Sequence, residues 1–478
     1  MRRLSTLLLL LLLPITLMVV NPEKAEARDD STTLTFGALG TLHIYRPAGD
    51  PQQVVLFASG DGGWNLGVLD MARALRDQGA MVIGFSTPHY LGSLNKRHAS
   101  CHYPAGDLEA VAQFVEKSFH LPHYHAPLLV GYSSGATLVY GALAEAPPGT
   151  FIGGISLGFS DDLAVRRPLC RGAGLHNVRS KDGKEYLLRP GALAVPWIAL
   201  QGDIDLDVSP KAANDFVARV KNGEIVNLPH VGHGFSVNRH WMPQYLAAYR
   251  KIVEQQEART KPVAPVALGD LPVIEVPATH PKGDTFAVIL SGDGGWVSID
   301  KDIGRQLAAS GMPVVGFNSL QYFWSPRNPV GMADDLDKII RHYLNAWHRS
   351  KVMLIGYSRG ADVLPFMVSR LSPALRKRVT LVGLLGPSLK TSFEFHVSDW
   401  LMDAAHGTDQ PIGPEVHKLD DLSILCVYGA DETDTLCPRL QGMKNVRMVK
   451  TEGGHHFDGD YRHLASLILH QAEVAANP

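Results

Sequence analysis

The chain has 478 residues, which is too long for one typical hydrophobic core, so its length predicts at least two domains. Hydrophobic residues make up 45% of the sequence and charged residues 19%, which is ordinary for a globular protein and excludes a fibrous or disordered one. The formal net charge of −2 leaves no basic surface of the kind that binds nucleic acid.

The first 27 residues have the pattern of a secretory signal peptide. Two arginines at residues 2–3 precede an apolar run over residues 7–20, and the sequence A-E-A at residues 25–27 matches a cleavage site. A run this short, interrupted by Pro14, is a poor membrane span. The pattern predicts export to the periplasm, with an uncleaved inner-membrane anchor as the alternative.

Two similar regions follow, residues 31–258 and 271–478, and a proline-containing segment without periodicity, residues 259–270, is the predicted linker. Each region alternates apolar strand-like runs with amphipathic helix-like segments. This pattern predicts two α/β domains, each a mostly parallel sheet flanked by helices. The runs are Val54–Ser59, Met81–Ser86, Pro127–Val130, Gly153–Phe159, Val195–Gly202 and Glu224–Leu228, then Phe286–Ser291, Val314–Asn318, Val352–Ile355, Val379–Gly386, Ile424–Gly429 and Val446–Lys450.

The same two motifs occur in both regions in the same order. S-G-D-G-G-W occupies residues 59–64 and 291–296, and G-x-S-x-G occupies residues 131–135 and 356–360. Each G-x-S-x-G follows a strand-like run and opens a helix-like stretch, which is the context of a nucleophile elbow. The sequence therefore predicts tandem α/β-hydrolase domains with Ser133 and Ser358 as nucleophiles.

Serine hydrolases of this fold carry their triad in the chain order nucleophile, acid, histidine. In the second domain this order selects Ser358, then Asp434 with Asp431 as fallback, then His455. We expect the histidine to take the serine proton and the carboxylate to orient the imidazole.

The first domain offers a parallel set. Ser133 is followed by His233 in a Gly-His motif, and Asp205 is the expected acid, with Asp203 and Asp207 as alternatives. The second domain has the sharper motifs and an aromatic segment at Tyr322–Trp324 where a lipid could bind, so we expect it to carry the main activity.

The early S-G-D-G-G-W loop follows the first apolar strand of each domain. In this fold a backbone N–H from that region joins the N–H of the residue after the nucleophile to form the oxyanion hole. The pattern nominates Asp293 with Arg359, and Asp61 with Ser134. The alternative is a tight turn in which the motif's tryptophan simply packs.

Four cysteines divide two per domain, and an exported protein with this arrangement is expected to form intradomain disulfides. Cys426 and Cys437 would close a short loop that contains Asp434, while Cys101 and Cys170 remain for the first domain. No third ligand accompanies His123 and His125, so we expect no metal site and no cofactor.

The two domains differ between their motifs. The first has a longer, polar segment at Tyr90–Ala105, where the second has Tyr322–Trp324. Both segments should lie at the carboxyl ends of the strands, where open α/β sheets bind ligands. The aromatic segment is a candidate acyl-chain groove, although aromatic packing within the domain is an equal alternative.

With these motifs, and with Y-G-A-D-E-T-D-T-L-C-P and G-G-H-H-F-D-G-D-Y in the second domain, the chain resembles the VirJ/AcvB family of bacterial virulence proteins. The resemblance is sharpest from Phe286 to Tyr461. It implies a periplasmic serine hydrolase that cleaves aminoacyl-phosphatidylglycerol, notably lysyl-phosphatidylglycerol, at the outer leaflet of the inner membrane. It also implies a link to virulence and type IV secretion.

Two other functions are compatible with these motifs. One is a non-catalytic periplasmic factor for secretion that keeps the fold as a scaffold, and the other is a generic lipase or esterase. Complete triad signals in both domains favour the enzyme, since a scaffold does not need a strained elbow.

Overall fold

The computed structural model describes residues 31–260, 268–296, 298–394 and 409–476. The predicted signal peptide and residues 261–267 of the predicted linker lie outside these ranges. Helix α6 (Met242–Thr260) extends into the first two positions of that linker. No helix among the described residues is long and apolar enough to cross a membrane.

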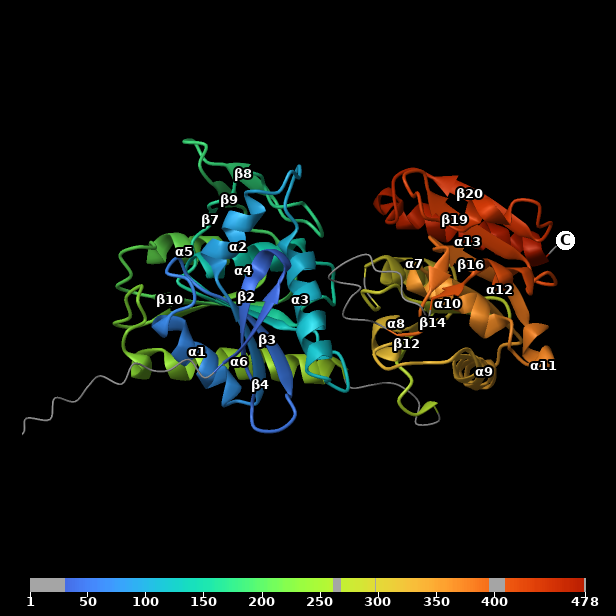
Figure 1. Cartoon of the computed structure of the whole chain (residues 1–478), viewed down its shortest axis with the longest axis horizontal. Helices are drawn as coiled ribbons and strands as arrows, with labels where there is room; N and C mark the ends of the chain where they lie inside the picture. The colour runs from blue at the N-terminus through green and yellow to red at the C-terminus, as the bar shows by residue number, and fades with distance from the viewer. Residues whose placement is uncertain (1–30, 261–267, 297, 395–408, 477–478) are drawn as a thin grey trace, which may run out of the picture. The chain divides into compact units, whose positions relative to one another are not determined.

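The first domain is built on a sheet with the strand order β1-β2-β4-β3-β5-β6-β10-β11 (Figure 1). Neighbouring strands from β4 to β11 are parallel. β2 pairs antiparallel with β4 on one side and with β1 on the other. The strands are β1 (Thr32–Phe36), β2 (Gly40–Tyr45), β3 (Gln53–Ala58), β4 (Ala80–Phe85), β5 (Leu128–Tyr132), β6 (Gly153–Leu157), β10 (Ala192–Gly202) and β11 (Lys221–Leu228).

The second domain repeats this sheet from β2 onward, in the order β12-β14-β13-β15-β16-β19-β20, with only β12 antiparallel. It has no counterpart of β1 among the described residues. The strands are β12 (Val273–Val276), β13 (Thr285–Leu290), β14 (Val314–Phe317), β15 (Lys351–Tyr357), β16 (Val379–Leu385), β19 (Ile424–Gly429) and β20 (Val446–Thr451). The predicted fold of two mostly parallel sheets is therefore confirmed.

Helices cover both faces of each sheet, because the strand side chains are apolar on both faces. In β3, Val54 and Leu56 belong to one core and Val55 and Phe57 to the other. The first face of the first sheet packs on α2 (Thr87–Leu94), α3 (Pro104–Ser118), α4 (Ser134–Glu145) and α5 (Pro210–Val217), and the second face on α1 (Leu66–Arg76) and α6.

The second sheet is covered in the same way. One face packs on α7 (Ser298–Ala309) and α13 (Tyr461–Ala476). The other packs on α8 (Ser319–Tyr322), α9 (Pro329–Ala346), α10 (Arg359–Val368), α11 (Pro373–Arg376) and α12 (Gly413–His417).

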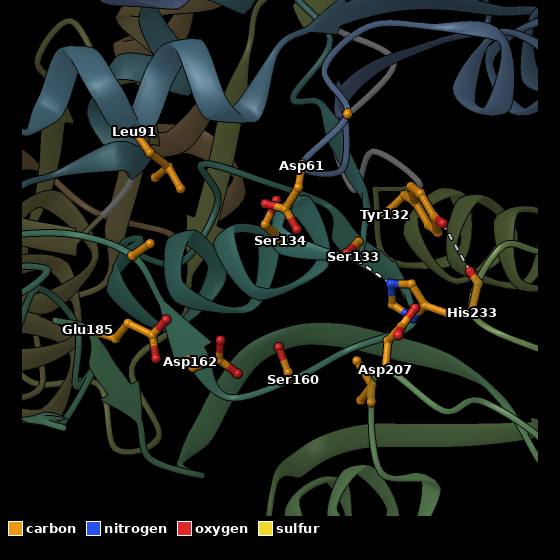
Figure 2. A pocket seen from close by; sticks show the side chains of 13 residues that line it. Asp61, Leu91, Tyr132, Ser133, Ser134, Ser160, Asp162, Glu185, Asp207 and His233 are labelled. Atoms are coloured by element: carbon orange, nitrogen blue, oxygen red, sulfur yellow. Dashed lines mark hydrogen bonds between the residues drawn. The ribbon is translucent and has the colours of Figure 1, made fainter. Parts of the chain in front are cut away.

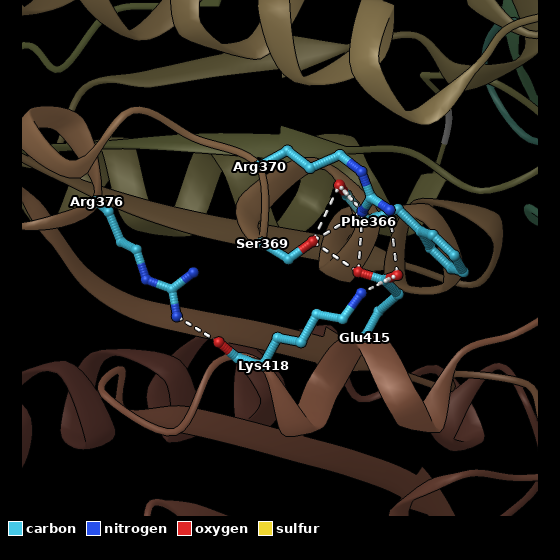
Figure 3. A network of polar contacts seen from close by, with 6 residues as sticks. All are labelled: Phe366, Ser369, Arg370, Arg376, Glu415 and Lys418. Atoms are coloured by element: carbon cyan, nitrogen blue, oxygen red, sulfur yellow. Dashed lines mark hydrogen bonds and ion pairs between the residues drawn. The ribbon is translucent and has the colours of Figure 1, made fainter.

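A charged network fixes the far end of α10 to α12 (Figure 3). Glu415 accepts hydrogen bonds from Arg370 at 2.9 Å, Ser369 at 2.7 Å and Lys418 at 2.8 Å. Burial opposes ionisation of this carboxylate, but the three donors prevail and lower the pKa of Glu415 to about 2. The helix that begins beside Ser358 is thereby held at its other end.

The sequence patterns did not predict the short sheets inserted between core strands. In the first domain, β7 (Asp162–Leu163), β9 (Tyr186–Leu188) and β8 (Asn177–Arg179) form a small antiparallel sheet between β6 and β10. It lies beside α2 at one end of the domain (Figure 1). In the second domain β17 (Lys390–Thr391) pairs with β18 (Gln410–Pro411).

Disulfides join Cys101 to Cys170 and Cys426 to Cys437. The first connects the loop before α3 to the excursion that carries the small sheet. The second connects β19 to the turn beyond the loop at residues 430–436. Such bonds are typical of proteins outside the cytoplasm.

Candidate active site

Both predicted nucleophiles lie on strained turns between a strand and a helix. Ser133 has φ 53° and ψ −121°, and Ser358 has φ 52° and ψ −121°. A positive φ is uncommon for any residue with a side chain and marks a position that the surrounding structure imposes. The two elbows are conformational copies of each other.

The glycines of G-x-S-x-G are required by close backbone approaches. A Cβ atom on Gly131 would lie 2.1 Å from the carbonyl oxygen of Gly135, and one on Gly135 would lie 2.3 Å from that of Ala58. The second elbow has the same crowding at Gly356 and Gly360. Any larger residue would therefore push the elbow off the sheet.

The elbows lie where the sheet topology opens a crevice. The chain passes from β3 to β4 on one side and then to β5 on the other side of β3, which makes the β3–β5 boundary a topological switch point. A Cβ on Gly60, just after β3, would lie 3.2 Å from Ser133 Cβ, and one on Gly292 would lie 3.3 Å from Ser358 Cβ. The S-G-D-G-G-W loop therefore adjoins the nucleophile in both domains.

The tryptophan of that loop packs against the sheet. Trp64 lies over Gly84 of β4, and Trp296 lies over Gly316 of β14; a Cβ on either glycine would collide with the indole ring. The tryptophan therefore packs as the alternative for this motif expected, and the loop also adjoins the nucleophile.

The first domain holds an unbroken hydrogen-bond chain from serine to carboxylate. Ser133 Oγ lies 3.0 Å from His233 Nε2, and His233 Nδ1 lies 2.9 Å from Asp205 Oδ2. The backbone carbonyl of His233 also accepts a hydrogen bond from Tyr132, as Figure 2 shows. This is the geometry in which histidine can act as base toward the serine.

Of the three aspartates that the sequence left open, Asp205 is the one that contacts the histidine. Its Oδ1 accepts from the N–H groups of Asp207 and Val208 at 3.0 and 2.9 Å, and its Oδ2 also accepts from Gln201. Asp203 instead accepts from the N–H of His230.

The one group of described residues with metal-ligand spacing is Asp205, Asp207 and His233. Both oxygens of Asp205 are already engaged by four donors, including the histidine. This group is therefore better explained as an acid–histidine pair than as an ion site.

In the second domain the acid that contacts the histidine is Glu432, and the predicted Asp434 is wrong. His455 Nδ1 lies 2.6 Å from Glu432 Oε1, whereas Asp434 is exposed and makes no contact with the histidine among the described residues. The fallback, Asp431, is also exposed. The reason is the position of the loop: Glu432 follows the strand-ending Gly429 by three residues, as Asp205 follows Gly202, and its second oxygen accepts the N–H of Gly429.

The Glu432–His455 pair alters the pKa of both partners. The hydrogen bond to Glu432 raises the pKa of His455 above its usual range, against the effect of burial. Burial alone would raise the pKa of Glu432, but hydrogen bonds from His455 and Gly429 lower it. Ser358 and His455 line the same pocket, but no hydrogen bond joins them within the described part of the chain.

The residues nominated for the oxyanion hole differ between the domains. In the second, Arg359 Nε lies 2.6 Å from Asp293 Oδ1, so the two side chains form an ion pair. In the first, Ser134 replaces the arginine, and Asp61 lines the pocket with its side chain exposed. Ser134 and Arg359 are the first residues of α4 and α10, so their N–H groups belong to the helix ends next to the nucleophiles.

A pocket of about 500 Å³ opens over Ser133 (Figure 2). Its wall opposite His233 comes from the inserted sheet, with Asp162 on β7 and Glu185 just before β9. The longer segment at Tyr90–Ala105 contributes only Leu91 to the lining. This wall was not predicted from the sequence, although the polar stretch between β6 and β10 is visible there.

The aromatic segment of the second domain is not a groove. Tyr322 is 1% exposed and Phe323 is fully buried, and the hydroxyl of Tyr322 donates to Asp335 at 2.7 Å. The rings of Tyr322 and Phe323 pack in the core of their own domain, so the packing alternative is correct for these two side chains.

Comparison with solved structures returns hydrolases that cover about half of this chain. An esterase domain from Rhodothermus marinus is 18% identical, with a TM-score of 0.31, and matches 48% of this chain and 98% of its own. An α/β serine hydrolase without a lid from Xanthomonas campestris is 23% identical, with a TM-score of 0.30, and matches 49% and 97%. Est1E from Butyrivibrio proteoclasticus is 13% identical, with a TM-score of 0.31, and matches 48% and 98%. No curated protein matches the chain.

A family profile described as "Bacterial virulence protein (VirJ)" matches residues 52–150 and 284–476. The matched residues include both elbows and the Glu432–His455 pair, but not Asp205 or His233 of the first domain. Together they make up more than half of the sequence. The chain therefore belongs to the VirJ family of bacterial virulence proteins and has the α/β serine hydrolase fold.

Proposed function

We propose that this protein is a periplasmic serine hydrolase that cleaves the aminoacyl ester of aminoacyl-phosphatidylglycerol, with lysyl-phosphatidylglycerol as the preferred substrate. The observation that carries the reaction type is the chain of contacts from Ser133 through His233 to Asp205, at 3.0 and 2.9 Å. The location is supported by the two disulfides and by the signal pattern of the sequence.

The reaction follows from these contacts. His233 takes the proton of Ser133 as its Oγ attacks the ester carbonyl, and returns the proton to the glycerol oxygen that leaves. Water then attacks the acyl-enzyme by the same route, releasing the amino acid and regenerating phosphatidylglycerol. An aminoacyl ester is an activated acyl group and is well suited to this chemistry.

The charge of the pocket supports a cationic acyl group. Four carboxylates line the space over Ser133, and no lysine or arginine does among the described residues. The four are Asp61, Asp162, Glu185 and Asp207. Burial raises the pKa of Glu185, and the neighbouring Asp162 adds to this effect, so an incoming ammonium group would relieve a repulsion.

The second domain is proposed to act on the same class of ester through Ser358, His455 and Glu432. The sequence assigns it the main activity, and that assignment stays a prediction. One of its grounds, the aromatic segment as a lipid groove, is wrong. The closed hydrogen-bond chain of the first domain makes Ser133 at least as well arranged.

The experiment compares hydrolysis of lysyl- and alanyl-phosphatidylglycerol in vesicles by the purified chain. Asp162→Asn with Glu185→Gln should lower the preference for the lysyl lipid, while Asp50→Asn, an exposed carboxylate outside the pocket, should leave it unchanged. Hydrolysis of simple esters but of neither lipid would favour a generic esterase. No hydrolysis at all, with virulence restored by a chain lacking both serines, would favour the non-catalytic secretion factor.

A further inference from the structure

The residue four positions after each nucleophile holds the end of a neighbouring strand. In the first domain, Thr137 Oγ1 donates to the carbonyl oxygen of Ser160 at 2.7 Å. In the second, Asp362 Oδ1 accepts from the N–H of Ser388 at 2.7 Å. Ser160 lies three residues beyond the end of β6, and Ser388 lies three residues beyond the end of β16. Each of these strands is the one that follows the elbow in the chain. The two domains thus make the same connection with a neutral donor in one case and a carboxylate in the other.

In the second domain, the segment anchored by this contact touches the rest of the site. Gly386 has φ 62° and lies against the histidine, since a Cβ there would be 2.9 Å from Cε1 of His455. The carbonyl of Pro387 accepts from the N–H of Leu436 at 2.9 Å, in the loop that carries Glu432. Three consecutive residues, Gly386–Ser388, therefore contact the base, the acid loop and the helix of the nucleophile.

Asp362 is 7% exposed and lies in the first turn of α10, where a helix favours negative charge. The charged groups that face it are the guanidinium of Arg359 on its own helix, the carboxylate of Asp293 on the loop after β13, and His455. Burial raises the pKa of Asp362 to about 7. Its carboxylate also contributes, after the hydrogen bond to Glu432, to the raised pKa of His455.

We propose that Asp362 is a positioning residue of the second-domain site: it holds Gly386–Ser388 against His455 and the Glu432 loop, and its negative charge supports the protonated imidazole that forms during acyl transfer. This inference rests on the proposed function, because it concerns the same hydrolytic site. The first domain, with Thr137 in the equivalent place, lacks this ionisable group. The two sites should therefore respond differently to pH.

The experiment follows the covalent reaction of Ser358 with a fluorophosphonate probe, measured by intact mass over a range of pH. The chain carries Ser133→Ala so that only one elbow reacts. Asp362→Asn removes the charge but keeps an acceptor for Ser388, Asp362→Ala removes both, and Asp334→Asn neutralises an exposed carboxylate as the control. Thermal unfolding verifies that each variant is folded.

We expect Asp362→Asn to slow labelling by about 10-fold and Asp362→Ala by about 100-fold, the range that small losses of catalytic geometry cause. The acid limb of the pH profile of Asp362→Asn should also move to lower pH. In the parent chain the Asp362 carboxyl has a pKa of about 7, so it takes up a proton in this range, and in its ionised form it raises the pKa of His455; asparagine does neither. The inference would be overturned if Asp362→Asn lost rate without a shift of the acid limb, or if it labelled at the parent rate with the parent pH profile. Either result would leave the hydrolase proposal intact. Failure of the parent chain to label at Ser358 would instead overturn both for this domain.

Discussion

His455 Nδ1 lies 2.6 Å from Glu432 Oε1. The loop that carries Glu432 also contains Asp431 and Asp434, the two acids expected from the sequence. With the Ser133→Ala background, Glu432→Gln should lower turnover at Ser358 by about 10²- to 10⁴-fold, because the imidazole loses the partner that fixes its tautomer. Asp434→Asn is the matched control and should stay within about twofold of the parent. Turnover of model esters by both variants tests this assignment, and a loss confined to Asp434→Asn would restore the acid expected from the sequence.

The division of work between the domains is tested by single serine substitutions. The sequence predicts that cells carrying Ser358→Ala accumulate aminoacyl-phosphatidylglycerol, whereas those carrying Ser133→Ala do not. Each change removes one hydroxyl from an elbow and should cost catalysis rather than folding. Lipid extraction and mass spectrometry measure the accumulation. Accumulation with Ser133→Ala alone would reverse the assignment, and accumulation with both would indicate two coupled sites.

The disulfide between Cys426 and Cys437 should stabilise the loop that carries Glu432. It closes a segment with a sequence separation of 11, and the chain-entropy account of such a loop gives about 2–3 kcal/mol. Replacing both cysteines by alanine should lower the unfolding free energy by at least this amount and slow probe labelling at Ser358, with labelling at Ser133 as the internal control. Recovery of two free thiols by non-reducing peptide mapping of exported protein would refute the bond.

The network around Glu415 should make stability depend on pH in acid. Its pKa is lowered from 4.5 to about 2, so its contribution is complete above the unfolded value of 4.5 and disappears as the pH falls through about 2. Since Lys418 is 56% exposed, we expect about 1–2 kcal/mol rather than the full shift.

Urea unfolding of the full chain against Glu415→Gln measures this contribution. The difference in unfolding free energy should be constant at neutral pH and shrink toward zero in acid, while Glu452→Gln, an exposed glutamate, should show none. A difference that grows on acidification would contradict the assigned pKa.

The sequence by itself was sufficient for the duplicated fold and for most of the reacting groups. The elbow is encoded in five adjacent residues, because the backbone at Gly131 and Gly135 leaves no room for a Cβ. The mostly parallel sheets flanked by helices follow from near-continuous apolar runs, which only a sheet covered on both faces can bury. For these reasons Ser133, Ser358 and the two histidines could be placed without coordinates.

Only the tertiary structure decided which carboxylate meets each histidine and what forms the pocket. Asp205 and Glu432 each follow the last glycine of their strand by three residues, a spacing that the sequence shows. Only the folded loop shows that this position, and not that of Asp434, reaches the histidine. The burial of Tyr322 and the acidic wall at Asp162 likewise depend on contacts between segments far apart in the chain. Local motifs specify a turn, whereas the partners of a side chain are set by packing.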